Sequence, residues 1–431
     1  MERKIVQVNQ RLPLAQGLPL SFQHMFAMFS ASVLVPTLLG INPGIVLLMN
    51  GIGTLLFILI TKGKSPAYLG SSFAFISPAI IVMGAKGMGY PYALGGFIAV
   101  GAVICIVAVI IRFFGTAWID ALLPPAAMGA VVALIGLELA GNAAQMGGIV
   151  ASKAYFPTVG WQNVVVFLVT LGVAAFGSVL FRKFFAVIPI LIAIVTGYII
   201  SLPLGLFDSV AGKNAIAAVS AAPWFSLPNF TAPAFNISAI SIIVPAALVV
   251  ISEHIGHQLV TGKIVERDLI KDPGLHKTLF ADGLSTMISG FCGSVPTTTY
   301  GENIGVMAIT RVYSVWVIGG AAVISILFAF IGKISAVIQS IPTPVMGGVS
   351  FLLYGMIAAS GIRVLVDAKV DYSKSKNLIL TSVVFVTGLS GAFIQIYNVQ
   401  LKGMALATIV GMVLGLIFYA VDHLHLANDA E

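Results

Sequence analysis

The chain has 431 residues, of which 59% are hydrophobic and 9% are charged. Soluble domains carry about 25% charged residues, so these values exclude an ordinary water-soluble globule. Apolar runs of about 20 residues, enough for a helix to cross about 30 Å of hydrocarbon, recur along the whole chain. The sequence therefore predicts an all-α polytopic membrane protein embedded in a lipid bilayer.

The formal net charge is +7, from 22 Lys and Arg and 15 Asp and Glu. Basic membrane loops explain this excess, so we expect no nucleic acid as a partner. The two cysteines, Cys105 and Cys292, lie in apolar runs without other ligand-type residues nearby. We therefore expect no disulfide framework, no metal site and no cofactor. The first apolar run begins near Leu18 with no cleavage pattern, so we expect no cleaved signal peptide.

Hydropathy predicts fourteen membrane spans, seven before and seven after a long loop at 204–236. An odd number of spans in each half makes the second half enter the membrane from the opposite side, which is an inverted repeat. In chain order the predicted ranges are 18–40, 43–61, 66–84, 91–111, 121–140, 161–181, 184–203, 237–260, 278–293, 300–314, 315–332, 342–362, 377–396 and 401–421.

The distribution of basic residues predicts the orientation of these spans. With a cytoplasmic N-terminus, seventeen of the 22 Lys and Arg lie on the cytoplasmic side. A miscounted span would exchange the sides of all later loops and remove this asymmetry, so we expect both termini in the cytoplasm. The five residues on the outer side are Lys86, Lys153, Lys213, Lys333 and Lys402.

Two pairs of similar segments lie seven spans apart, as an inverted repeat requires. LPPAAMG (Leu123–Gly129) opens the fifth span, and IPTPVMG (Ile341–Gly347) opens the twelfth. SSF (Ser71–Phe73) lies in the third span, and TTY (Thr298–Tyr300) lies at the tenth. Repeats with interrupted helices at matching positions are typical of secondary transporters that bind their substrate near the membrane midplane.

Four acidic residues lie within or beside the predicted spans: Glu138, Glu253, Asp282 and Glu302. A charge at bilayer depth costs about 2.5–3.5 kcal/mol on insertion scales, so each requires a physical reason. Glu138 and Asp282 fall near the ends of predicted spans. We expect them at the membrane interface and not as ligands of a substrate.

Glu253 lies in the segment VVISEHIGHQLV. His257 follows four residues later and so lies on the same helix face, whereas His254 points elsewhere. A carboxylate and an imidazole in a low-dielectric environment can share or exchange a proton. A polar pair that holds two helices together is the alternative interpretation.

Glu302 follows the segment TTTYG. Thr299 and Glu302 have the spacing of a capping box, which would close a helix N-terminus. A helix that begins within the membrane also has free N–H groups, which are tolerated only where they line a cavity. Both interpretations are compatible, so Glu302 is predicted to serve a ligand as well as a helix end.

The segment AYLGSSFAFISP contains a matching interruption of the third span. There Phe73 offers an aromatic ring and a backbone N–H to a ligand, and a structural kink at Pro78 is the alternative. Gln23 and His24, near the start of the first span, fit either an interfacial polar pair or a network that supports the site.

The segment ENIGVMAITR, with Glu302, Asn303 and Arg311 among its residues, resembles the signature motif of the nucleobase–ascorbate transporters, the nucleobase:cation symporter 2 family. Gln23–His24, YLGSSFAFISP and EHIGH also resemble this family, in particular its bacterial uracil permeases. The likeness extends from about residue 10 to residue 421.

The resemblance implies a core domain of residues 1–117 and 237–335 that moves against a gate domain of residues 118–236 and 336–431. It also implies two short antiparallel strands in spans three and ten that cross at mid-membrane. The chain would then form a homodimer in the bacterial cytoplasmic membrane.

The function implied by the resemblance is proton-coupled uracil uptake, with the proton as coupling ion and no enzymatic activity. The residues that would hold the pyrimidine are Glu253, Glu302, Phe73, Gly301 and Tyr300. Glu253 and His257 would couple transport to the proton. The residues that would support this site from behind are Asn303, Ser72, His24, Gln23 and Ala31.

Three alternatives stay open on the sequence alone. A xanthine or urate permease of the same family is one, although Glu at position 302, where other members have Gln, favours uracil. An anion exchanger or channel would need a positive charge facing its substrate, and Arg311 falls at the cytoplasmic end of its span. An intramembrane hydrolase would need a motif such as HExxH, and EHIGH lacks its first histidine.

Overall fold

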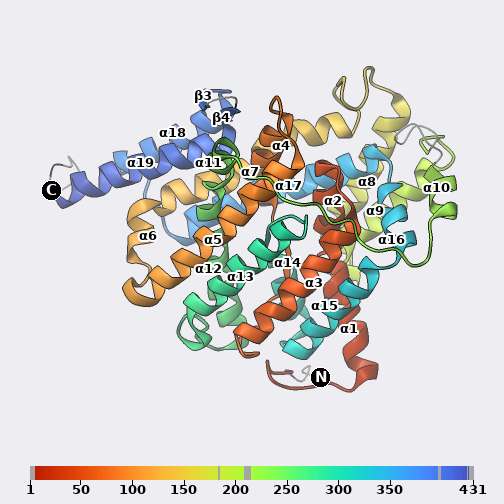
Figure 1. The fold of residues 1–431 in the computed structure, drawn as a ribbon, viewed down its shortest axis with the longest axis horizontal. Helices are drawn as coiled ribbons and strands as arrows, with labels where there is room; N and C mark the ends of the chain where they lie inside the picture. The colour runs from red at the N-terminus through yellow and green to blue at the C-terminus, as the bar shows by residue number, and fades with distance from the viewer. Residues whose placement is uncertain (1–4, 183–184, 208–214, 397–398, 425, 427–431) are drawn as a thin grey trace.

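The computed structural model describes residues 5–182, 185–207, 215–396, 399–424 and 426. The fold is mostly helical, with its elements drawn in chain order from red to blue in Figure 1. Within the described residues, eight helical segments are long and apolar enough to cross a membrane, and four shorter helices are apolar. Among the basic residues used for the orientation, Arg3, Lys4, Lys183 and Lys213 lie outside the described residues.

The elements up to the long loop are α1 (Leu14–Ala27), α2 (Phe29–Leu39), α3 (Pro43–Ile60), β1 (Leu69–Ser71), η1 (Phe73–Phe75), α4 (Ile76–Gly84), α5 (Tyr90–Phe114), α6 (Ala117–Leu122), α7 (Pro125–Met146), α8 (Trp161–Leu180), η2 (Phe185–Val187) and α9 (Pro189–Ser201). The later elements are α10 (Ala215–Ala221), α11 (Ile237–Ile243), α12 (Ala246–Val265), η4 (Ile270–Gly274), α13 (Leu275–Phe291), β2 (Thr297–Thr299), α14 (Gly301–Thr310), α15 (Val315–Ala329), α16 (Gly332–Gln339), α17 (Thr343–Asp367), α18 (Ser375–Leu389), β3 (Phe393–Ile396), β4 (Val399–Lys402) and α19 (Gly403–His423).

Several predicted ranges differ from the helices in the structure. The strand β2 precedes the predicted range 300–314, and the predicted range 66–84 holds β1, η1 and α4. The predicted helix 377–396 is wrong beyond Leu389, because residues 393–396 form β3, which pairs with β4 as an antiparallel hairpin. Gly391 has a φ of +76° between α18 and β3, a conformation that favours glycine and commonly follows a helix end.

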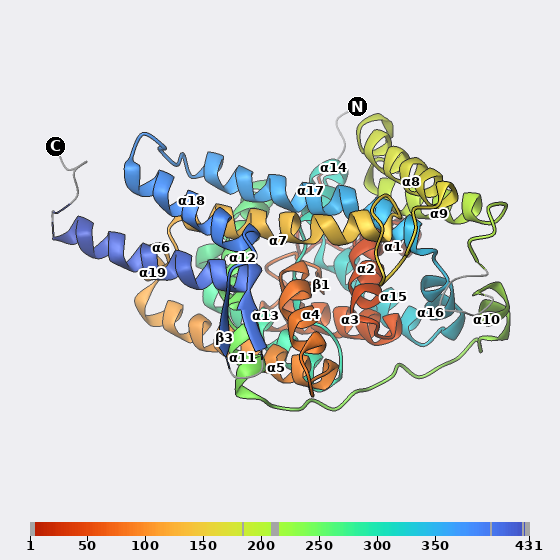
Figure 2. The same cartoon turned by 90° about the horizontal axis from the view of Figure 1, so that it is seen from above.

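The helices pack in two groups. In one group α3 packs against α13 and α15, and α5 packs against α13. In the other group α7 packs against α17, α18 and α19, and α8 packs against α9 and α17. Figure 2 shows α7 lying alongside α17 in the second group, with β1 near the centre of the molecule.

Small residues allow α5 and α13 to approach closely. A Cβ atom on Gly101 of α5 would lie 2.6 Å from the carbonyl oxygen of Gly283 on α13. A Cβ atom on Gly283 would lie 2.9 Å from the carbonyl oxygen of Gly101. Close backbone approach at small residues is the usual basis of helix packing in membranes, where lipid is as apolar as the side chains.

We predict that Gly101→Ala destabilises the protein by about 1–3 kcal/mol, because the added methyl group must push α5 and α13 apart. Gly172→Ala on α8 is the matched control, since nothing lies within 4 Å of a Cβ atom there. Thermal unfolding of the purified protein in detergent measures both. Equal melting temperatures for Gly101→Ala and the control would contradict the prediction.

Candidate functional site

Two short strands from distant parts of the chain meet near the centre of the helical bundle. β1 pairs with β2 in antiparallel register, with Leu69 opposite Thr299, Gly70 opposite Thr298 and Ser71 opposite Thr297. All six residues are buried. The two strands hydrogen-bond to each other, which satisfies backbone N–H and C=O groups that would otherwise lie unpaired in an apolar environment.

A helix begins directly after each strand, and the antiparallel register makes the two helices extend in opposite directions from the sheet. η1 and α4 follow Ser72, whose N–H donates to the carbonyl oxygen of Pro296 at 2.9 Å. α14 follows Tyr300, whose N–H donates to the carbonyl oxygen of Tyr68 at 3.1 Å. Both helix N-termini, with their unpaired N–H groups and positive dipole ends, therefore lie beside the strand pair.

Side chains do not cap these two helix N-termini. Neither Ser72 nor Tyr300, the residues at the cap positions, makes a side-chain hydrogen bond to the following turn. The predicted capping box of Thr299 and Glu302 is therefore wrong. Thr299 belongs to β2, one residue before the cap position, and its hydroxyl lies 3.0 Å from His257 Nδ1. Apart from the N–H of Glu302, which donates to its own carboxylate, the N–H groups of Phe73 and Gly301 at these two helix starts have no partner among the described residues. Such groups can receive a ligand.

Glu302 lies in the first turn of α14, and Glu253 lies on α12, which packs against α14. Both side chains are half-buried, whereas neighbouring His254 and Asn303 are buried. The two carboxylates are near enough to interact electrostatically with each other and with Tyr300. The structure thus brings together the two acidic residues that the sequence assigned to one site, beside the free end of α14.

His257 on α12 lies beside the junction of β2 and α14. Its Nδ1 lies 3.0 Å from the Thr299 hydroxyl, and a Cβ atom on Gly301 would lie 3.3 Å from its Nε2. The imidazole is held by Thr299 rather than by a direct hydrogen bond with Glu253. Gly301 is exposed, so the backbone at the start of α14 is open to a ligand on one side.

Phe73 and Tyr300 follow the two paired strands, Phe73 after β1 and Tyr300 after β2. Phe73 is half-buried at the first position of η1 and contacts both main hydrophobic clusters. Tyr300 is only 5% exposed, and its hydroxyl donates to the Ser71 carbonyl oxygen at 2.6 Å. Its ring covers Gly70, where a Cβ atom would lie 2.8 Å away. In this structure the Tyr300 hydroxyl holds β1 against the start of α14.

The residues assigned to the supporting layer are all buried. Asn303 Nδ2 donates to the His24 carbonyl oxygen at 3.0 Å and lies 3.1 Å from His24 Nδ1, which ties α14 to α1. Gln23 is 5% exposed, and Ala31 and Ser72 are each 1% exposed. Ala31 packs in the same hydrophobic cluster as Tyr300.

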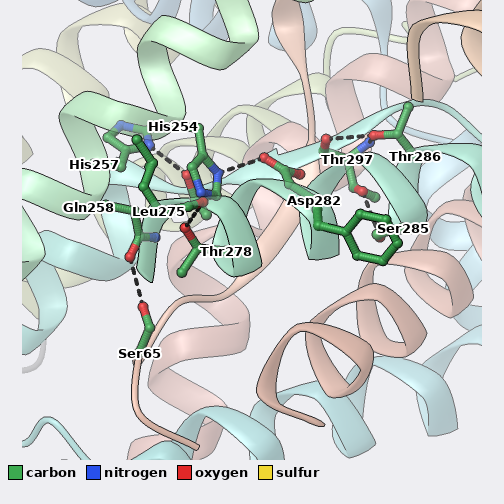
Figure 3. A network of polar contacts seen from close by, with 12 residues as sticks. Ser65, His254, His257, Gln258, Leu275, Thr278, Asp282, Ser285, Thr286 and Thr297 are labelled. Carbon is green, nitrogen blue, oxygen red and sulfur yellow. Dashed lines mark hydrogen bonds and ion pairs between the residues drawn. The ribbon is translucent and has the colours of Figure 1, made fainter. Parts of the chain in front are cut away.

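The sequence placed Asp282 near the end of a predicted span, but in the structure it does not lie at the edge of the fold. It lies in the middle of α13, is fully buried, and has its Oδ2 2.8 Å from His254 Nδ1 (Figure 3). The predicted span began at residue 278, whereas α13 begins at Leu275 and carries Asp282 inward. A buried carboxylate requires such a partner, because an unpaired charge costs several kcal/mol.

Further polar contacts anchor β2 to α13. The Thr286 hydroxyl donates to the Thr297 carbonyl oxygen at 3.0 Å, and the Ser285 and Thr297 hydroxyls lie 2.7 Å apart (Figure 3). Sequence reasoning missed these residues and the His254–Asp282 pair. The one sequence signal that they share is the presence of polar residues inside an apolar helix. This signal is weak, because Ser and Thr side chains also hydrogen-bond to backbone carbonyl groups of their own helix.

Glu138 on α7 has two partners on other helices. The Ser77 hydroxyl on α4 donates to Glu138 Oε1 at 2.6 Å, and the Met404 N–H at the start of α19 donates to Oε2 at 2.9 Å. The carboxylate thus lies at a helix N-terminus, where the dipole stabilises a negative charge. Glu138 therefore connects α7 to α4, which packs against α5 of the first group, and to α19 of the second group.

Comparison with solved structures defines the class of protein. The fold is similar to the transmembrane domain of a cyanobacterial bicarbonate transporter, BicA, with a TM-score of 0.60, 13% identity, and coverage of 97% of this chain and 99% of that one. It is also similar to the murine anion transporter Slc26a9 in an inward-facing state, with a TM-score of 0.70, 10% identity, and coverage of 96% of this chain and 69% of that one. At these identities the similarity establishes the fold, which is that of a helical multi-pass membrane transporter.

Sequence comparison then establishes the family. The model of the Permease family that covers xanthine and uracil permeases matches residues 15–397, so the chain belongs to this family and is a permease rather than an enzyme. It is 57% identical to the uracil permease of Escherichia coli K12 over 434 residues, covering 100% of this chain and 98% of that protein. It is 55% identical to the uracil permease of Paenibacillus larvae, with both chains fully covered. The resemblance seen in the motifs is thereby confirmed.

We predict that Tyr300→Phe lowers the free energy of unfolding by about 1–2 kcal/mol, because the buried Ser71 carbonyl oxygen loses its donor. Tyr313→Phe is the control, since Tyr313 is also buried and its hydroxyl has no hydrogen bond among the described contacts. Thermal unfolding and uracil binding are measured for both variants. If Tyr300→Phe leaves stability unchanged but weakens uracil binding, the prediction is wrong and the Tyr300 hydroxyl contacts the ligand instead.

Proposed function

We propose that the protein is a uracil importer that couples uptake to the entry of protons. The observation that carries this proposal is the meeting of two half-buried carboxylates, Glu253 and Glu302, beside two uncapped helix N-termini. The names of its relatives at 55–57% identity, all uracil permeases, support uracil as the substrate.

The chemistry of the site matches an uncharged ring with both donors and acceptors. Uracil has two N–H groups and two carbonyl oxygens around a flat ring. Carboxylates accept from the N–H groups, and the backbone N–H groups of Phe73 and Gly301 donate to the carbonyl oxygens. A site that pairs with every edge rejects an analogue that leaves a buried polar group unpaired.

Glu253 and His257 are our proposed proton-coupling residues. Both lie on α12 and are half-buried, so they remain accessible from the site while much of their surface is removed from water. Protonation of Glu253 would remove the repulsion between the two carboxylates. Uracil would then bind a singly charged pair from outside, and loss of the proton toward the cytoplasm would favour release.

The fold supports alternating access between two domains. We propose fourteen membrane crossings as a seven-plus-seven inverted repeat, with both termini in the cytoplasm and two chains in a homodimer. The twelve apolar segments found by length and composition, together with α13 and α14, would supply these fourteen crossings. The helices that pack around α3, α5, α13 and α15 would form the core, and those around α7, α17, α18 and α19 the gate.

The anion transporters of similar fold raise a second candidate function, and the site argues against it. Arg311 is exposed at the C-terminal end of α14, about 13 Å along the helix from Glu302. Within the described part of the chain, neither Glu253 nor Glu302 forms an ion pair with a basic side chain, and two such carboxylates would repel an anion. A purine permease remains the closer alternative, and competition by excess xanthine against labelled uracil distinguishes the two substrates.

We predict that Glu253→Gln in proteoliposomes abolishes uracil accumulation driven by an imposed pH gradient, because glutamine cannot release a proton. Exchange of internal for external uracil should persist, because it requires no net proton movement. Glu266→Gln, at the exposed end of the same helix, should behave as wild type. Full gradient-driven accumulation by Glu253→Gln would refute the coupling role.

We propose that the Ser77–Glu138 hydrogen bond holds the core against the gate in one state of the cycle. Ser77→Ala should speed backbone hydrogen exchange in α4 several-fold, whereas α19 should be unaffected, because its bond to Glu138 lies within the gate. Ser241→Ala is the control, since that hydroxyl bonds its own helix at Ile237. Equal exchange of α4 in the wild type and Ser77→Ala, or equal acceleration of α4 and α19, would contradict this role.

A further inference from the structure

A groove of about 250 Å³ lies between the ends of α3, α5 and α13, away from the candidate substrate site. One wall is apolar and is formed by Ile60, Val109 and Phe280. The side chains of Val109 and Phe280 are 49% and 38% exposed, so this wall faces outward from the helical bundle. On a membrane-spanning protein, outward-facing apolar side chains contact lipid acyl chains.

The other wall of the groove is cationic. Arg112 comes from the last turn of α5, and His276 and Lys277 come from the first turn of α13. No acidic residue lines the groove, and none of the described ion pairs involves Arg112 or Lys277. The positive charges therefore lie close to one another without a protein anion to compensate them.

A larger cavity nearby differs from this groove in that its basic residues lie beside acidic ones. Its volume is about 440 Å³, and it is lined by three basic and two acidic residues. There Lys64 is paired with Asp272 at 2.7 Å, and Asp268 accepts from the backbone N–H groups of Ile270 and Lys271. The charges that line this larger cavity are largely compensated, and no apolar side chain forms a wall of it. We therefore propose no ligand for it.

We propose that the groove between α3, α5 and α13 binds an anionic phospholipid. Its phosphate would contact Arg112 and Lys277, with His276 beside them, and its acyl chains would lie along Val109 and Phe280. Basic pockets between transmembrane helices recognise anionic headgroups in this way. Charge counting predicts that this end of the helices is cytoplasmic, so the lipid would come from the inner leaflet. The bound lipid would link α5 to α13, the helix that anchors β2.

The test is thermal unfolding of the full chain in neutral detergent during titration with phosphatidylglycerol or with phosphatidylcholine of the same acyl chains. We expect saturable stabilisation by phosphatidylglycerol alone. The double variant Arg112→Gln/Lys277→Gln should need about tenfold or more lipid for the same shift, since each basic residue contributes about 1 kcal/mol to such binding. The control variant Lys369→Gln/Lys374→Gln removes two predicted cytoplasmic charges outside the groove and should titrate as wild type.

Two results of this titration would overturn the proposal. In the first, lipid binding is weakened equally in the groove variant and in the control variant. Binding would then depend on the overall charge of the protein and not on the groove, as expected if these basic residues serve only to orient the chain. In the second, inorganic phosphate stabilises the protein as much as phosphatidylglycerol does, which would identify a soluble anion as the ligand.

A photoactivatable phosphatidylglycerol with its reactive group on the acyl chain provides a second test on the wild type. Labelling should concentrate in peptides that contain Val109 and Phe280, and labelling elsewhere would contradict the proposal.

Discussion

The site depends on how two interrupted helices satisfy their backbone groups inside an apolar bundle. An unpaired N–H or C=O in hydrocarbon costs several kcal/mol, so a break within a membrane segment is tolerated only when partners are supplied. β1 and β2 supply partners to each other across more than 200 residues of sequence. Among the described residues, this pairing leaves the N–H groups of Phe73 and Gly301, at the starts of η1 and α14, without partners, and the proposed ligand site lies beside them.

The surrounding residues follow from this constraint. Tyr300 and the Thr286–Thr297 contact hold the strands, and Asn303 ties α14 to α1. These groups are buried, whereas Glu253, Glu302 and His257 retain some exposure. The residues that position the site therefore differ from those proposed to bind. The groups proposed to contact uracil and to carry the proton lie on a buried layer that these hydrogen bonds join together.

Sequence patterns predicted the parts of this arrangement that depend on local composition. Long apolar runs predicted most helices to within a few residues, and the interruption at Gly70–Ser72 together with Glu253 and Glu302 indicated the site. The His254–Asp282 pair was missed because it joins residues 28 positions apart, and only the packing of α12 against α13 brings them together. The β3–β4 hairpin was missed because FIQI extends the apolar run of α18, and the alternation of apolar and polar residues in VQLK covers only four residues, which is a weak strand signal.

Our proposal places Glu253 and Glu302 on opposite sides of a bound pyrimidine. Anomalous diffraction from crystals grown with 5-bromouracil tests it most directly, because the bromine position fixes the ring. We expect a single strong peak between α12 and the N-termini of η1 and α14, with ring edges within hydrogen-bonding distance of both carboxylates. A peak beside Arg311, or in any location that one of the two carboxylates cannot reach, would contradict it.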